Sequence, residues 1–216
     1  MDGGVGTRDL VHYELAFLCV SERCGMSKRD HLRRLSREHY LGNAIVHWSV
    51  TTVERKQGWL SAKFLYRFRE LLTHSMFRYG LACPIFCLMP DHIHMVWMGL
   101  LEESDQLNAM KHFRPNCDES LKRIGFQLQD QAYDHVLNEE ERRETEFRNV
   151  CLYVARNPER AGLVESGGYA TYPYAGCIVP GYPDLRPFDS GYWAELDKIV
   201  SFLRNDGLMR VGDRKR

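Results

Sequence analysis

The chain has 216 residues, of which 44% are hydrophobic and 27% charged, a composition typical of one globular domain with its own core. Its 29 basic and 29 acidic residues balance, which argues against a protein that coats nucleic acid by bulk attraction, although a local basic patch is compatible with binding. Seven cysteines without CxxC spacing exclude an obvious disulfide framework or structural zinc site and favour reduced thiols in a cytoplasm.

The N-terminal segment gives few structural signals. Residues 1–9 are rich in glycine and are predicted to be disordered, and residues 10–20 are apolar but too short to span a bilayer. A cytoplasmic protein that does not contact membranes is therefore expected. Residues 26–39 carry five lysines and arginines, which fit either a solvated helix face or an arm that contacts phosphate.

The next elements have clear periodicity. Residues 45–54 alternate and are rich in β-branched side chains, which predicts a strand. Residues 59–80 have apolar side chains at helical spacing and end in Gly80, a residue suited to a C-terminal cap. Two further strands, 81–89 and 92–100, are separated by Pro90-Asp91 and predict a β-hairpin.

The second half is predicted less sharply. A helix over 103–114 is expected to break at Pro115, and residues 126–137 favour a strand. Residues 138–162 are charged and then amphipathic, which predicts one helix or two, ending near Gly162. The following segment is rich in glycine, proline and tyrosine and is predicted to be mostly loop, before a last helix over 192–205.

This order of elements predicts an α+β sandwich, with helices packed on one face of an antiparallel sheet. Within the third strand, His92 and His94 project from one face, while Ile93, Met95 and Trp97 occupy the other. Two imidazoles held in this way can chelate one divalent ion. An HxH pair on the solvent face of a strand has the same pattern, so the residues alone leave both readings open.

A third ligand and a reacting group are available in the helix that ends in LYVARNPERAGLV. Tyr153 and Asn157 are four residues apart and share a helical face. The amide oxygen of Asn157 can complete a site with two imidazoles, although Pro158 disfavours helical geometry at Asn157 and is expected to kink the helix there. Tyr153 also fits ordinary packing of its ring against the sheet.

MPDHIHMVW (89–97), followed by YVARNPERAGLV (153–164), resembles the single-tyrosine HUH transposases, and most closely the REP-associated tyrosine transposases. The resemblance covers residues 44–175. It implies a ferredoxin-like HUH endonuclease and transposase fold, with an N-terminal extension over 1–43 and a C-terminal extension over 176–216.

The resemblance also implies a chemistry. His92, His94 and Asn157 would bind Mg²⁺ or Mn²⁺, and Tyr153 would attack DNA to form a 5′-phosphotyrosine intermediate. The implied partner is single-stranded DNA beside a palindromic hairpin, processed for DNA transposition or for domesticated handling of repeats. Some relatives act as homodimers and others as monomers, and the sequence does not choose between these states.

Other residues have weaker signals. Arg156 and Arg160 are candidates for DNA phosphate contacts, although plain helix-surface charges fit as well. Trp48, Trp97 and Tyr172 have the chemistry to stack on bases, but core packing is preferred for each, and structural support is preferred for Asp134 and His135. Two alternatives to the transposase reading are a hairpin-DNA-binding protein without catalysis and a metal-dependent nuclease that uses water.

Overall fold

The computed structural model describes residues 34–205. The predictions for residues 1–9 and 10–20, and for the basic residues before Arg34, lie outside the described residues. Five strands form one sheet in the order β4-β1-β3-β2-β5, and each neighbouring pair is antiparallel. The strands are β1 (Ile45–Thr51), β2 (Leu81–Leu88), β3 (His92–Gly99), β4 (Tyr133–Val136) and β5 (Ala175–Ile178).

Within residues 34–205, five helices and three short 3₁₀ segments accompany the sheet. The helices are α2 (Ala62–Tyr79), α3 (Gln106–Lys122), α4 (Glu144–Ala155), α5 (Asn157–Arg160) and α6 (Tyr192–Asn205), and the 3₁₀ segments are η1 (Arg37–Tyr40), η2 (Val53–Arg55) and η3 (Gly168–Thr171). The β1-α2-β2-β3-α3-β4 part with strand order 4-1-3-2 is a ferredoxin-like arrangement, so the predicted α+β class is confirmed.

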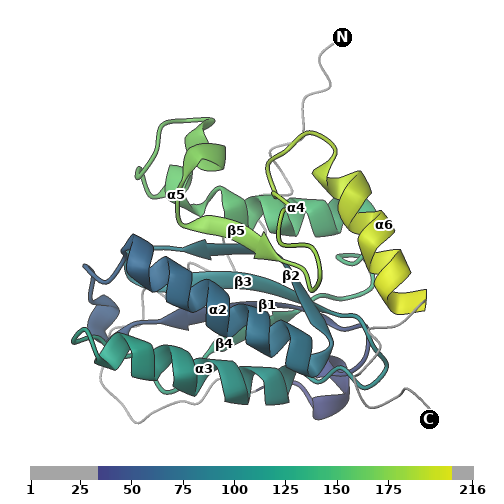
Figure 1. Cartoon of the computed structure of the whole chain (residues 1–216), viewed down its shortest axis with the longest axis horizontal. Coiled ribbons are helices and arrows are strands. Elements are labelled where there is room, and N and C mark those ends of the chain that lie inside the picture. The colour runs from purple at the N-terminus through teal and green to yellow at the C-terminus, as the bar shows by residue number, and fades with distance from the viewer. Residues whose placement is uncertain (1–33, 206–216) are drawn as a thin grey trace. The chain divides into compact units, whose positions relative to one another are not determined.

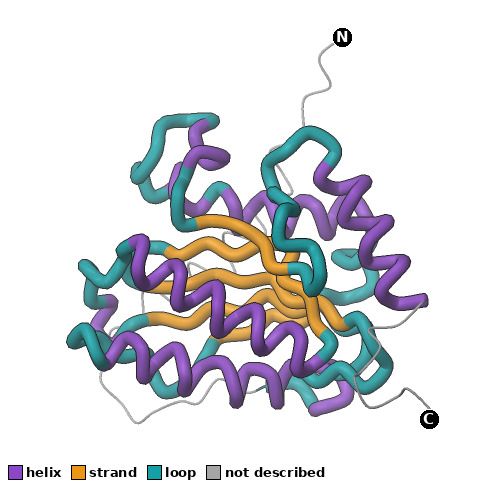
Figure 2. Tube along the Cα trace, viewed as in Figure 1, coloured by secondary structure: helices purple, strands orange, loops and turns teal. Residues whose placement is uncertain are grey.

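One face of the sheet forms the main core. Trp48 on β1 and Trp97 on β3 are fully buried there against Phe68 and Leu72 of α2 and Phe113 of α3. Figures 1 and 2 show α2 and α3 side by side across this face. The alternation of apolar and polar residues in β1 therefore has the expected cause, because every second side chain packs under these helices.

The opposite face is covered as well, which departs from the expected arrangement of helices on one face. Helix α4 packs over β2 and β3 on that side (Figure 1). All eight residues of β2 are buried, and both faces of such a strand need a covering layer. The run LACPIFCL is apolar throughout and does not alternate with polar residues. This pattern by itself indicates a strand that is covered on both faces.

The predicted elements can be compared with the observed ones. Helix α2 ends at Gly80 with φ of +60°, as its predicted C-terminal cap requires, and the last helix occupies 192–205 as expected. The predicted strand over 126–137 is limited to β4. The segment predicted as loop contains β5, whose four residues pair with β2.

The predicted break at Pro115 is wrong, because α3 continues through that residue to Lys122. Pro115 is exposed, so the carbonyl of Lys111, which loses its backbone donor, faces the side of the helix near water. Phe113, Cys117 and Leu121 are buried on both sides of the proline, and their packing keeps the helix continuous.

No helix within residues 34–205 combines the length and the apolar character that a membrane span requires.

Candidate active site

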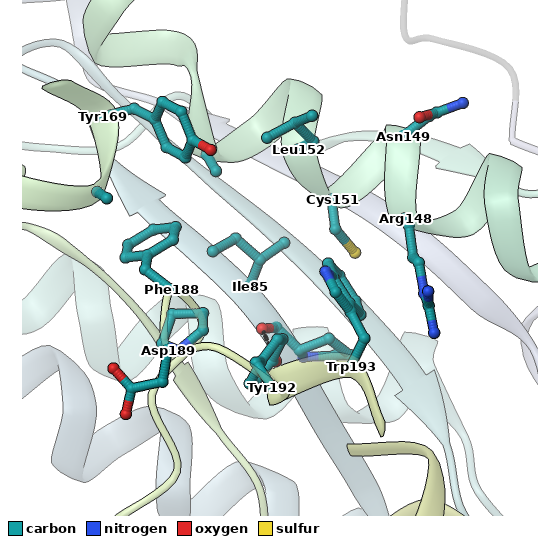
Figure 3. Close-up of a pocket in the computed structure, with 14 residues that line it drawn as sticks. Ile85, Arg148, Asn149, Cys151, Leu152, Tyr169, Phe188, Asp189, Tyr192 and Trp193 are labelled. Carbon is teal, nitrogen blue, oxygen red and sulfur yellow. Dashed lines mark hydrogen bonds between the residues drawn. The ribbon is translucent and has the colours of Figure 1, made fainter. Parts of the chain in front are cut away.

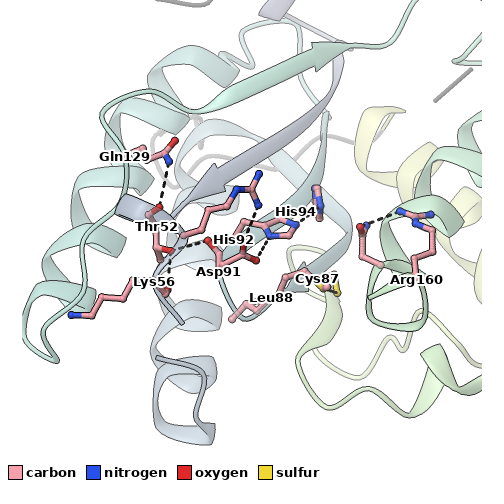
Figure 4. Close-up of polar contacts among 12 residues, drawn as sticks. Thr52, Lys56, Cys87, Leu88, Asp91, His92, His94, Gln129 and Arg160 are labelled. Carbon is pink, nitrogen blue, oxygen red and sulfur yellow. Dashed lines mark hydrogen bonds and ion pairs between the residues drawn. The ribbon is translucent and has the colours of Figure 1, made fainter. Parts of the chain in front are cut away.

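His92 and His94 project from the face of β3 that lies under α4, as alternation predicts. Their Nε2 atoms approach to 2.9 Å, and the two ring planes are nearly perpendicular at 88°. When both rings carry their protons on Nδ1, each Nε2 has a lone pair. The two lone pairs are then directed at one point, where they can bind one cation. Figure 4 shows the pair at the start of the strand.

Asp91 and Arg55 hold the ring of His92. Asp91 Oδ1 lies 2.6 Å from His92 Nδ1, and Arg55 Nη1 donates to Asp91 Oδ2 at 2.8 Å. Burial acts to raise the pKa of Asp91, but the hydrogen bond with His92 and the Arg55 guanidinium outweigh it and lower the pKa to about 2. The ionised carboxylate can only accept, so the proton of this contact lies on His92 Nδ1 and Asp91 fixes the orientation of the ring.

The turn that carries Arg55 is strained. Glu54 and Arg55 have φ angles of 56° and 51°, a region that residues other than glycine rarely adopt. Thr52 closes the turn, because its backbone N–H and its hydroxyl both contact the carbonyl oxygen of Asp91 at 2.9 Å, while Gln129 donates to the carbonyl of Thr52 (Figure 4). The surrounding contacts thus maintain a backbone conformation that brings a guanidinium to the carboxylate beside His92.

A third histidine, His47 on β1, contacts His94 from the other side. Its Nε2 lies 3.0 Å from His94 Nδ1, and both side chains are almost completely buried. Burial is the main cause that lowers the pKa of His47 to about 3 and that of His94 well below its usual value, so both rings are neutral at physiological pH. His47, His92 and His94 are called the histidine cluster below.

Sequence reasoning did not find His47, although a signal was present. Residues His47, Ser49 and Thr51 are the polar members of an alternating strand, and in the antiparallel register Ser49 faces His94 and Thr51 faces His92. A polar stripe beside a predicted HxH strand marks the same face. The pairing of β1 with β3 was needed to see it.

Tyr153 lies on α4, and its side chain is largely buried, with 8% of the residue exposed. The guanidinium of Arg160 sits 3.7 Å from the centroid of the Tyr153 ring, within the range of a cation–π contact. The ring therefore packs between the helix and a cation. Arg160 comes from α5, one turn beyond the end of α4.

Asn157 stands where the two helices meet, and the kink predicted near Pro158 is present. Helix α4 ends at Ala155, Arg156 has φ −86° and ψ 4°, and α5 begins at Asn157 with Pro158 in its first turn. Pro158 cannot donate to the carbonyl of Val154. The side-chain amide of Asn157 donates there instead at 3.1 Å, and to the carbonyl of Tyr153 at 3.2 Å.

The remaining atom of that amide, Asn157 Oδ1, accepts from Arg160 Nη2 at 3.0 Å. Tyr153, Asn157 and Arg160 thus form a second group, called the tyrosine cluster below. The structure brings the predicted residues together as these two groups. The Arg160 guanidinium contributes, after burial and the neighbouring histidines, to the lowered pKa of both His47 and His94.

Arg160 also acts on Cys87, the β2 residue that pairs with His94 across the strands. Figure 4 shows the Cys87 side chain between the histidine pair and Arg160. The positive charge of the Arg160 guanidinium therefore affects the pKa values of His47 and His94 in the histidine cluster. The two groups belong to one region on the same face of the sheet.

Other candidate residues have structural contacts. Arg156 pairs with Glu159 and lies over the ring of Tyr169. Asp134 accepts hydrogen bonds from Tyr40 and Arg34 and His135 pairs with Glu141, in line with structural support. Trp48, Trp97 and Tyr172 are buried in the core, as preferred from the sequence.

A cavity of about 320 Å³ borders α4 on its outer flank. Its lining includes Ile85, Leu152, Tyr169, Phe188 and Trp193 (Figure 3). None of the residues in the histidine and tyrosine clusters lines this cavity. The metal-ligand candidates therefore lie apart from it.

The residues of the two clusters fit a divalent cation in their donor chemistry. Within residues 34–205, no three His, Cys, Asp or Glu side chains form a group that would hold a metal, so a third protein ligand must be of another type. His92 and His94 supply two nitrogens directed at one point, and Nδ1 of each ring has a hydrogen-bond partner, which is typical of metal-binding histidines. The Asn157 oxygen is a hard donor suited to Mg²⁺ or Mn²⁺.

The antiparallel sheet and the order of its helices and strands define a ferredoxin-like α+β fold, with His92 and His94 on β3. No family model matches the sequence, and no curated protein matches it. Among solved structures, the chain is similar in fold to a REP-associated tyrosine transposase bound to a REP hairpin, with a TM-score of 0.55 and 15% identity over 69% of this chain and 82% of that chain.

A putative transposase from Deinococcus radiodurans R1 also matches, with a TM-score of 0.38 and 13% identity over 60% of this chain and 98% of that one. At 15% identity, the likeness to the REP-associated tyrosine transposase is one of fold.

Proposed function

We propose that this protein is a metal-dependent, transposase-like enzyme that cleaves and rejoins single-stranded DNA beside a hairpin. The observation that carries the proposal is the approach of the two imidazoles of His92 and His94, Nε2 to Nε2 at 2.9 Å, on the sheet face that is covered by the helix bearing Tyr153. The MPDHIH and YVARNPERAG motifs support it, as does the fold of a transposase that binds a hairpin.

In this proposal, His92, His94 and Asn157 hold Mg²⁺ or Mn²⁺. The bound cation would polarise the scissile phosphate and neutralise the charge that develops on its oxygens. All three ligands are neutral, so DNA phosphate supplies the negative charge that strengthens binding. Asp91 and His47 orient the two rings, and Arg160 lies beside the oxygen of Asn157.

Tyr153 is the proposed nucleophile. Its phenolic oxygen would form a bond to phosphorus while the bond from phosphorus to the 3′ oxygen breaks, and the proton that the phenol loses is balanced by one that the 3′ oxygen gains. The products are a 5′-phosphotyrosyl enzyme and a free 3′-hydroxyl. The covalent bond conserves the energy of the phosphodiester, so attack by a 3′-hydroxyl rejoins the strand without ATP.

Arg160 is the better supported of the two proposed phosphate contacts. Its guanidinium is near both clusters, its residue is exposed, and a cation there would meet a DNA strand that reaches Tyr153. Arg156 is engaged by Glu159 and Tyr169, and its proposed role is weaker for that reason.

Hairpin oligonucleotides labelled at either end test the proposal and separate its rivals. With Mn²⁺, the fragment carrying the 5′ label is expected to appear as a free 3′-hydroxyl product, while the 3′-labelled fragment migrates with denatured protein. Two free fragments would instead indicate a nuclease that uses water. Hairpin binding without any cleavage would indicate a binding protein.

A further inference from the structure

We propose that the cavity on the outer flank of α4 binds one unpaired base of the DNA strand on which the enzyme acts. The inference rests on the proposed function and extends it to a second site, made in part by residues 187–193. These residues lie beyond the region that resembles the HUH transposases, so the resemblance assigns them no role. Three observations carry the inference: the aromatic rings of the cavity, the arginines stacked on those rings, and the position of the cavity beside the proposed nucleophile.

The walls of the cavity are aromatic and partly open to solvent. Tyr169 from η3, Phe188 from the loop before α6 and Trp193 from α6 line it, and each is only half-buried. Figure 3 shows the rings of Tyr169 and Phe188 on one side of Ile85 and the indole of Trp193 on the other. Ile85 is 2% exposed and belongs to β2. The three rings therefore do not complete the core but border a space that a ligand can enter.

The cavity has the size and the chemistry of a site for one flat ring. Its volume of about 320 Å³ is at the lower end of the range for ligand sites. Tyr169 and Phe188 meet edge to face, with centroids 5.7 Å apart and planes at 79°, an arrangement that leaves ring faces free for stacking. Leu152, 38% exposed on α4, adds an apolar side to the same space. Every DNA base has a flat face, and proteins bind unpaired bases by stacking them on aromatic side chains.

Two arginines add positive charge to this aromatic surface. The guanidinium of Arg148 lies 5.6 Å from the centre of the Trp193 ring, and that of Arg156 lies 5.9 Å from the centre of the Tyr169 ring. Neighbouring carboxylates hold both guanidiniums, but each guanidinium has five N–H donors, which leaves donors for phosphate. Asp189, the one acidic residue of the lining, directs its carboxylate away from the rings (Figure 3).

This combination of rings and charge selects the kind of ligand. A nucleotide joins a flat ring to a negatively charged phosphate, so it matches both the aromatic walls and the two arginines. An apolar side chain of a protein partner would match the rings alone. The charge complementarity therefore favours a base of a DNA strand.

The cavity adjoins the proposed nucleophile through one helix. Leu152 lines the cavity, and the next residue, Tyr153, lies beneath Arg160. Side chains of adjacent helical residues are about 100° apart around the axis, so the two sites lie around one turn of α4. A single strand that is joined to Tyr153 can therefore place a neighbouring base in the cavity along the surface of this helix. A base held there would fix which phosphate lies at Tyr153.

Removal of single bases tests the inference. The probe is a DNA hairpin with thymine flanks on both sides, in which each flank position in turn carries an abasic site. Binding to the full-length protein is measured by fluorescence anisotropy in EDTA, so that cleavage does not interfere. Wild type is expected to lose affinity on the order of tenfold at one flank position, where the base would enter the cavity.

Two variants of Phe188 connect that position to the cavity. Phe188→Leu keeps an apolar side chain but removes the ring, so it is expected to weaken binding of the intact probe by a similar factor and to abolish the effect of the abasic site. Phe188→Trp keeps a ring and is expected to retain the effect. Phe202→Leu is the matched control, because Phe202 is 51% exposed on α6 and does not line the cavity.

Photocrosslinking gives a readout that needs no variant. With iodouracil in place of thymine at the sensitive position, wild type is expected to give a crosslink that mass spectrometry maps to Tyr169, Phe188 or Trp193. An abasic scan without a sensitive position, a folded Phe188→Leu variant that keeps the full effect, or a crosslink elsewhere would overturn the inference, and the cavity would then fit an apolar side chain of a protein partner. Wild type that shows the base effect and the crosslink but no cleavage with Mn²⁺ contradicts the proposed function instead, and the cavity then serves a DNA-binding protein.

Discussion

At the scale of single residues, the two β3 histidines combine burial with defined partners. His94 is 3% exposed and sits between His92 and His47, whereas the side chain of His92 is 19% exposed at the start of the strand. A buried imidazole nitrogen needs a polar partner, and the neighbouring ring supplies one. The proposed function assigns the pair a further role, as two ligands of one cation.

Replacing either imidazole tests this explanation. His92→Ala and His94→Ala are each expected to lose divalent-dependent cleavage while hairpin binding persists, because phosphate and base contacts supply affinity separately from the chemistry. Cleavage and filter-binding assays with the same hairpin measure the two properties. A variant that loses binding together with its thermal unfolding transition would show that the residue is structural.

At the scale of elements, the junction of α4 and α5 combines two tasks in Asn157. Its amide nitrogen donates to the carbonyl of Val154, to which Pro158 cannot donate, and to that of Tyr153, and its oxygen is the proposed ligand. The two tasks use different atoms of one side chain. A substitution that alters only the nitrogen therefore separates them.

Asn157→Asp is that substitution. It removes the donor to the carbonyls of Tyr153 and Val154, and the free energy of unfolding is expected to fall by about 1–3 kcal/mol. Mn²⁺ binding is expected to tighten, since a carboxylate is a stronger ligand for a hard cation than an amide. Asn149→Asp, on the same helix, is the control for added charge. Unchanged Mn²⁺ affinity in the Asn157→Asp variant would contradict the ligand role.

Helix α3 allows a test of how core packing keeps a helix continuous through a proline. Pro115 is exposed inside the helix, and an interior proline costs about 3 kcal/mol relative to alanine. Pro115→Ala restores a backbone donor for the carbonyl of Lys111, so urea unfolding is expected at higher denaturant concentration. Lys111→Ala, an exposed change one turn earlier, is expected to have little effect. A lower midpoint for Pro115→Ala would contradict the view that the proline weakens α3.

At the scale of the whole molecule, buried thiols predict how stability depends on pH. Five described cysteines are buried, and burial raises the pKa of Cys87 and of Cys117 to about 12, from 9.0 in the ordinary thiol. The unfolded chain releases these protons first as pH rises. The stabilisation is therefore complete below about pH 9 and is lost towards pH 12.

Each such thiol contributes up to about 1.4 kcal/mol per pH unit in that window. Urea unfolding of the reduced protein is expected to weaken steeply between about pH 9 and 11. Cys117→Ala is expected to show a shallower slope, because one of the raised groups is absent. A stability that is equal at pH 8 and pH 11 would contradict the burial of these thiols.

Much of this architecture follows from local pattern. The alternation in β1, the helical spacing of α2 and the turn at Pro90-Asp91 each depend on neighbouring residues, and each was predicted correctly. His92 and His94 share a face because they belong to one strand. The kink at Pro158 follows from the chemistry of proline alone.

The features that escaped prediction depend on contacts between distant segments. His47 meets His94 only through the register of β1 with β3, and β5 forms because β2 offers it an edge. Pro115 stays helical because core side chains on both sides of it are packed. Local pattern contains none of these partners: the apolar run of β2 indicates that both faces are covered, but which helix covers the second face, and that His47 meets His94, required the structure.

The central claim is that Tyr153 becomes covalently joined to DNA, and mass spectrometry of the adduct tests it most directly. Tyr153→Phe removes only the hydroxyl and leaves the ring beneath Arg160, so the fold is expected to survive. Tyr169→Phe is the matched control, with Tyr133, Tyr172 and Tyr174 as the other rivals in neighbouring segments.

Wild type and Tyr169→Phe, incubated with single-stranded hairpin DNA and Mn²⁺, are expected to give an adduct that resists denaturation and carries its nucleotide on residue 153. Tyr153→Phe is expected to give none. An undiminished adduct in Tyr153→Phe, or a nucleotide mapped to another tyrosine, would contradict the account.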